Sequence, residues 1–171
     1  MTGVFRIVAA VILFCVGLAA PAMAHTPDIS TGKILPKDNR TYAVEVGFLA
    51  TDLERMFQDT MSERAAVDLS APGAPEAEIG KFVQKRVAMR DATGRACIAN
   101  VEKSGEDPTN QDSALVMIRF DCGGTTGTLF YDATKLLAAQ GAKGKHLVTL
   151  EGSENAGQTM LYPDDPPLAL S

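Results

Sequence analysis

Apolar and polar residues alternate in several segments of the chain, which is the pattern of half-buried β-strands. The clearest example is 41–50, in which every second residue from Tyr42 to Phe48 is apolar or aromatic. Turn-forming residues at 36–40 precede this segment. The segment 29–35 is therefore expected to be the other strand of a hairpin.

Apolar residues follow a helical spacing in the next part of the chain. A first helix there would bury Leu53 and Phe57, and a second helix, beginning at Pro75, would bury Ile79. Proline suits the first turn of a helix, where its missing N–H group has no intrahelical partner. The pattern predicts a short helical insertion around 52–86.

From residue 87 onward the pattern again favours strands separated by turns. Further strands are expected at 87–89, 96–101, 114–122, 128–131, 146–151 and 158–162. The polar segment 104–112 is expected to form a loop, and Leu168 and Leu170 are expected to add a short edge. Seven to eight short strands with turns between them predict a mainly β fold, an antiparallel, immunoglobulin-like β-sandwich.

The start of the chain has the three parts of a secretory signal peptide. Arg6 is followed by the apolar run 7–20 and by small residues that end in Ala24, with His25 next. The run is 14 residues long, whereas a membrane-spanning helix needs roughly 20. We expect cleavage after Ala24, which makes 1–24 the signal peptide and exports a single domain, 25–171, to the periplasm.

The net charge of the chain limits the classes of molecule that it is expected to bind. The chain has 16 basic and 21 acidic residues, and Arg6 is the only charge before the expected cleavage site. The mature protein would carry 15 basic and 21 acidic residues, a net charge of −6. This excess of acidic residues argues against binding of nucleic acid.

Two cysteines remain after cleavage, because Cys15 lies inside the apolar run. An even number of cysteines in an oxidising compartment indicates a disulfide, here between Cys97 and Cys122. A metal site formed by the two thiols is the alternative, although no Cys-x-x-Cys spacing supports it. The strands expected around these residues would bring them within one or two positions of each other.

None of the sequence motifs predicts catalysis. His146 lies in an expected strand, and no Gly-x-Ser-x-Gly motif accompanies it. Its position on the face of Val148 is typical of a half-buried histidine with satisfied hydrogen bonds. The glycine-rich segment 123–127 lacks the lysine and the following helix of a phosphate-binding loop. We therefore expect a non-catalytic protein.

The residue after the expected cleavage site is a candidate metal ligand. A mature N-terminal His25 would present an α-amine and an imidazole together, a donor set that suits copper or nickel. His146 and Asp28 are the candidate further ligands, and the protein would then be a periplasmic carrier of copper or nickel. The alternative is that His25 is part of a frayed terminus.

The chain resembles the extracytoplasmic N-terminal domain of HupE/UreJ-type hydrogenase and urease accessory membrane proteins. The features that carry this resemblance run from the cleavage point at Ala24-His25, through the Cys97 strand and the strand 114–122, to the closing hairpin. The resemblance implies an accessory or binding domain beside a polytopic membrane protein, associated with nickel or cobalt movement. The spanning helices of that family have no counterpart before Ser171. The expected role is therefore docking on a separately encoded membrane partner.

Overall fold

The computed structural model describes residues 29–61, 74–152 and 156–170. These residues form nine strands and three helices, so the prediction of a mainly β fold is confirmed. The strands are divided between a sheet of six and a sheet of three. The immunoglobulin-like sandwich that was expected is not confirmed by this arrangement.

The larger sheet contains both antiparallel and parallel pairs. Its strands, in spatial order, are β4 (Ile98–Asp107), β5 (Asn110–Asp121), β2 (Thr41–Leu49), β1 (Ile29–Pro36), β7 (Lys145–Leu150) and β8 (Gly157–Leu161). Neighbours are antiparallel except β1 and β7, which are parallel. The expectation of antiparallel pairing was wrong at this pair. A long connection through the smaller sheet allows β7 to return parallel to β1, and alternation along a strand does not indicate its direction.

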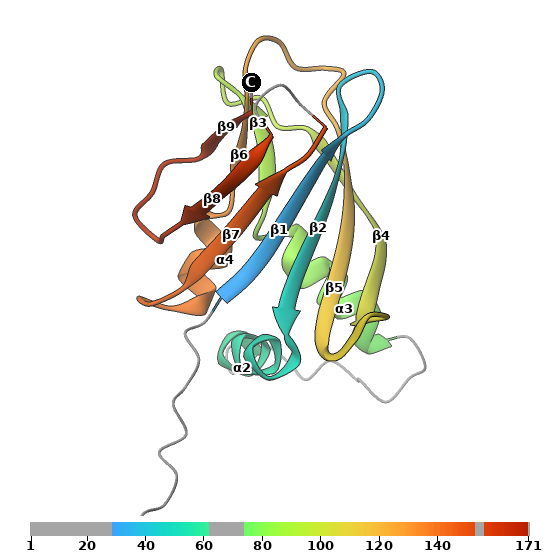
Figure 1. Ribbon diagram of the computed structural model, residues 1–171, viewed down its shortest axis with the longest axis vertical. Coiled ribbons are helices and arrows are strands. Elements are labelled where there is room, and N and C mark those ends of the chain that lie inside the picture. The colour runs from blue at the N-terminus through green and yellow to red at the C-terminus, as the bar shows by residue number, and fades with distance from the viewer. Residues whose placement is uncertain (1–28, 62–73, 153–155, 171) are drawn as a thin grey trace, which may run out of the picture.

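The smaller sheet and two helices cover one face of the larger sheet (Figure 1). The smaller sheet is antiparallel, with β3 (Ala88–Asp91), β6 (Leu129–Asp132) and β9 (Leu168–Leu170). The helices are α2 (Ala50–Met61), α3 (Ala74–Gln84) and α4 (Thr134–Gln140). Helix α2 lies across the end of the larger sheet, and α3 and α4 lie behind it (Figure 1). Helices α2 and α3 lie where the sequence predicted a short helical insertion, around 52–86.

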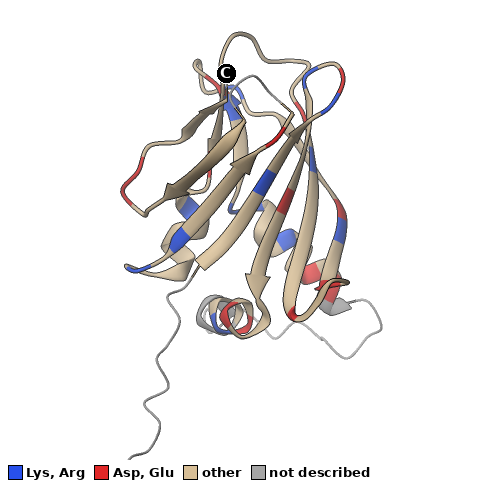
Figure 2. Ribbon diagram, viewed as in Figure 1, with Lys and Arg blue, Asp and Glu red and all other residues tan. Residues whose placement is uncertain are grey.

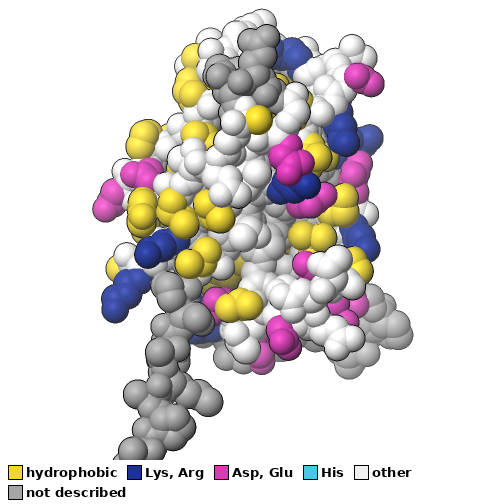
Figure 3. All heavy atoms as spheres, in the orientation of Figure 1, with side chains coloured by type: hydrophobic (Ala, Val, Ile, Leu, Met, Phe, Trp, Pro, Cys, Tyr) yellow, Lys and Arg dark blue, Asp and Glu magenta, His cyan; other side chains and the backbone are white. Residues whose placement is uncertain are grey.

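The core lies between the larger sheet and the elements behind it. Alternate residues of the strands point inward and are fully buried, among them Ile34, Val44, Val116 and Val148. The outer face of the larger sheet carries separate groups of hydrophobic side chains with polar and charged residues between them (Figure 3). The sheet therefore has one face in the core and one toward solvent.

The expected loop at 104–112 is instead the end of a long hairpin. Strand β4 continues to Asp107 and β5 already begins at Asn110. The Asp107 carboxylate accepts hydrogen bonds from the backbone N–H and the hydroxyl of Thr109, which closes the turn. The polar composition misled the prediction because the side chains at this end of the hairpin are mostly exposed, while cross-strand pairing continues.

The disulfide between Cys97 and Cys122 is confirmed. Cys97 lies directly before β4, and Cys122 directly after β5, so the bond closes the open end of the hairpin. Both residues are buried, and their Cα atoms are 4.4 Å apart. The opposite end of the same hairpin extends toward α2 and α3 (Figure 1).

Candidate functional site

An apolar groove lies between α2, α3 and the turn end of the β4–β5 hairpin. Leu53 and Phe57 line it from α2, Ile79 lines it from α3, and Ala114 lines it from β5. Its volume is about 340 Å³, within the range of pockets that hold small ligands or anchoring side chains. The same helical spacing that predicted the two helices therefore also supplies the walls of the groove.

Small residues and hydrogen bonds hold α3 close to β4. A Cβ atom on Gly80 would lie 2.9 Å from Cγ1 of Val101, so a glycine is needed where the helix crosses the strand. The Ser104 hydroxyl donates to the carbonyl oxygen of Glu76, and the Gln84 amide donates to the carbonyl oxygen of Ala99 at 2.7 Å. These contacts fix α3, one wall of the groove, on β4 of the hairpin.

The rim of the groove is acidic. Glu54 of α2, Glu76 of α3 and Glu106 of β4 line it, and all three are exposed. Among the described residues that line the groove, these glutamates are the only charged ones. Figure 2 shows acidic residues at this end of the molecule, on the helices and near the hairpin turn. The site therefore combines an apolar floor with a negative rim.

His146 belongs to a buried polar cluster away from this groove. Its Nδ1 atom is 2.8 Å from the Ser30 hydroxyl, and its Nε2 atom is 3.0 Å from the Tyr131 hydroxyl. All three side chains have no exposed surface. Gly32 leaves room for the imidazole, because a Cβ there would lie 2.6 Å from Nε2. The cluster joins strands of the two sheets.

Burial determines the protonation of this cluster. It lowers the pKa of His146 to about 4, against a small opposing effect of the Ser30 hydrogen bond, and it raises the pKa of Tyr131. Both groups are therefore neutral at neutral pH, and the Tyr131 hydroxyl donates to Nε2 when Nδ1 carries the proton. A serine hydroxyl beside an imidazole is the start of a nucleophilic site. Here neither group is reached by solvent, so the arrangement acts as a structural hydrogen-bond network.

The structure bears on only part of the predicted metal-ligand set. Ala24, His25 and Asp28 lie outside the described residues. The third candidate ligand, His146, has a partner at each ring nitrogen, and both cysteines are in the disulfide. Over 29–61, 74–152 and 156–170, no three histidine, cysteine, aspartate or glutamate side chains form a group that could hold a metal ion. Binding of copper or nickel by His25 stays a prediction.

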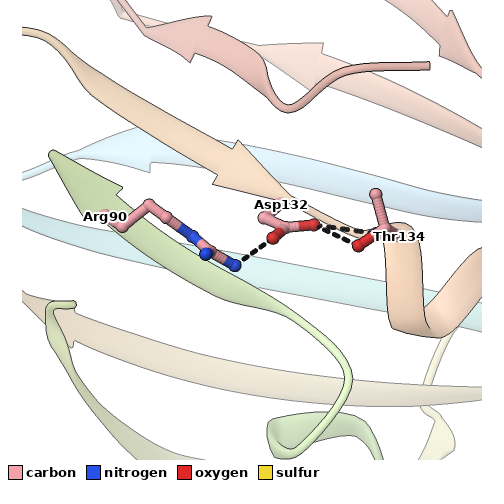
Figure 4. Close-up of polar contacts among 3 residues, drawn as sticks. All are labelled: Arg90, Asp132 and Thr134. Atoms are coloured by element: carbon pink, nitrogen blue, oxygen red, sulfur yellow. Dashed lines mark hydrogen bonds and ion pairs between the residues drawn. The ribbon is translucent and has the colours of Figure 1, made fainter. Parts of the chain in front are cut away.

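A second polar cluster lies between β3, β6 and α4 (Figure 4). The guanidinium of Arg90 pairs with one carboxylate oxygen of Asp132, and the other oxygen accepts hydrogen bonds from the N–H and hydroxyl of Thr134. Burial alone would raise the pKa of Asp132, but the Thr134 hydrogen bonds and the charge of Arg90 outweigh it and lower that pKa. The carboxylate thus joins β3 to the start of α4.

The two ends of this pair are expected to contribute unequally to stability. The Arg90 side chain is 43% exposed and that of Asp132 is 11% exposed. Asp132→Ala should lower the free energy of unfolding by about 2 kcal/mol, because buried hydrogen bonds to a charged group are lost. Arg90→Met should cost less than about 1 kcal/mol, as for other solvated ion pairs. Urea denaturation measures both values, and equal losses would contradict this assignment.

Sequence reasoning did not find the groove. Its glutamates are far apart in the chain and belong to no motif. The available signal was the exposed side of the two amphipathic helices. The helices alone do not locate the groove, because its third wall is the end of the β4–β5 hairpin, where β4 reaches residue 107.

Comparison with known proteins does not assign the chain to a family. No protein-family model matches the chain, and no curated protein matches it significantly. Among the described residues, no helix has the length and apolar character needed to cross a membrane.

Proposed function

We propose that the chain is an exported, non-catalytic binding domain that docks through the groove onto an extracytoplasmic segment of a membrane protein. The observation that carries this proposal is the apolar groove, whose walls come from three elements fixed to the core. An apolar concave surface with a few polar groups at its edge is the usual form of a binding site. Phe57 and Ile79 are partly buried in its walls, and Leu53 is buried beneath them.

A binding role is also favoured over catalysis by the location of the reactive groups. The groove contains glutamate and glutamine at its edge, whereas the imidazole of His146 lies in the core. General acid–base chemistry needs a titrating group within reach of a bound substrate. The glutamates of the groove are exposed at its rim, and His146, whose pKa is lowered to about 4 by burial, does not line it.

The location and the partner belong to the same proposal. The signal-peptide pattern at 1–24 supports export to the periplasm, and the resemblance to HupE/UreJ-type accessory proteins supports a polytopic membrane protein as the partner. The immunoglobulin-like character of the sandwich is part of the proposal as well. For the partner, the resemblance favours a membrane protein that transports metal ions.

Site-specific photocrosslinking in the source organism tests the docking. A photoreactive residue at Ala50 or Gln111, both exposed and both lining the groove, should give a light-dependent adduct with an integral membrane protein. The matched positions Thr159 and Asp164 are exposed and do not line the groove. They should give no such adduct. Equal adducts from both pairs, or none from the groove positions, would refute docking through this surface.

A further inference from the structure

We propose that the groove selects a cationic partner segment, in which large apolar side chains are flanked by lysine or arginine. This inference rests on the proposed function, and it adds the chemistry of the partner. Its basis is the combination of one apolar floor with three carboxylates from three separate elements. Electrostatic complementarity of this kind governs the choice of partner and the rate of association.

The three glutamates are placed to act together. Glu54 lies in α2, Glu76 lies near the start of α3, and Glu106 lies at the turn end of β4. Gly105 is in the left-handed region at a φ of 141°, and a Cβ atom there would lie 3.2 Å from Cγ of Glu76. This close approach places the turn end of the hairpin, which carries Glu106, against α3, which carries Glu76.

Two cations on the helices lie close to acids that do not line the groove. Lys81 of α3 is 2.8 Å from Glu78, and Arg55 of α2 is 3.8 Å from Asp52. Neither Glu78 nor Asp52 lines the groove. Of the described residues that line the groove, three are acidic and none is basic. An excess of one charge in a low-dielectric cleft attracts the opposite charge.

The dimensions of the groove favour side chains as the occupants of its floor. A volume of about 340 Å³ lies near the lower end of the range for ligand pockets, roughly 300–1,000 Å³. One or two large apolar side chains would fill it, and the main chain that carries them would remain at the rim. Lysine or arginine next to those side chains would then meet Glu54, Glu76 and Glu106.

Binding of short labelled peptides to the mature protein tests the inference by fluorescence anisotropy. The first peptide alternates leucine with lysine, the second has glutamine for each lysine, and the third has glutamate for each lysine. The lysine peptide should bind most tightly, and the glutamate peptide should not bind. Raising the salt concentration from about 0.05 M to about 0.5 M should weaken the lysine peptide about tenfold, because exposed charges are screened.

Two triple variants distinguish the effect of the rim glutamates from the effect of the overall net charge. The first is Glu54→Gln with Glu76→Gln and Glu106→Gln, and it should bind the lysine peptide about tenfold more weakly, from three solvated ion pairs. The control is Glu45→Gln with Glu102→Gln and Asp164→Asn, which removes the same charge away from the groove and should bind normally. Circular dichroism confirms that both variants are folded.

The outcomes separate this inference from the proposed function. Equal binding of the lysine and glutamine peptides, or equal weakening by the two triple variants, would overturn the inference and leave apolar docking standing. A neutral apolar dye distinguishes the remaining case. If no peptide binds and Ala50→Leu leaves dye binding unchanged, both the inference and the groove itself are overturned, because Ala50 lines the groove.

Discussion

Lowering the pH from about 6.5 to about 4 is expected to reduce the free energy of unfolding by about 3 kcal/mol, because His146 is buried as a neutral imidazole. Its pKa is lowered from 6.5 to about 4 in the folded protein. Between these values the unfolded chain binds a proton that the folded chain does not bind. Falling pH therefore favours unfolding, and this contribution is fully retained above pH 6.5.

The acidic groups act in a different pH range. The Thr93 hydroxyl and backbone N–H groups donate hydrogen bonds that lower the pKa of Asp91 to about 2, against the effect of its burial. The pKa of Asp132 is also lowered. These carboxylates lose their stabilising effect only as the pH falls below their ordinary value of 3.8. The loss expected above pH 4 is therefore assigned to His146.

Urea denaturation at several pH values measures this loss, and His146→Gln is the non-titrating control. The variant should be less stable at pH 7, since its amide replaces a fitted imidazole, and its stability should change little between pH 6.5 and 4.5. Should it fail to fold, NMR of the wild-type imidazole gives the same information. Titration of His146 near its ordinary value of 6.5 would contradict the assignment.

The local elements could be predicted from the sequence, and their long-range pairing could not. The alternation in β2 and the helical spacing in α2 indicate which side of each element is buried. Both elements were predicted at the correct place in the chain. The direction of β7 beside β1 depends on how the chain crosses to the smaller sheet and returns. No local pattern contains that information, because a buried strand looks alike in parallel and antiparallel pairs.

The candidate site was less predictable than the fold for a related reason. The inward side of His146 follows from its spacing to Val148, and the disulfide follows from cysteine number and strand order. The hydrogen bond of His146 to Tyr131 in β6, and the placement of Glu54 and Glu106 around one groove, result from packing between elements that are remote in the chain. The sequence determines these contacts only through the complete fold.

Reduction of the Cys97–Cys122 bond is expected to lower the free energy of unfolding by about 3.5 kcal/mol. The bond closes a loop with a sequence separation of 25 residues, and the chain-entropy model assigns this value to a loop of that size. In a domain of this length each kcal/mol shifts the melting temperature by roughly 2–4 °C. The reduced protein should therefore melt about 10 °C lower than the oxidised protein.

Urea denaturation with and without a reducing agent measures this effect, with Cys97→Ala/Cys122→Ala as the control that reduction must leave unchanged. The bond lies at the open end of the β4–β5 hairpin, and the groove lies at the turn end. Below its own melting temperature the reduced protein should therefore still bind the neutral apolar dye. Equal stability of the oxidised and reduced proteins would show that the hairpin is held by its strand pairing alone.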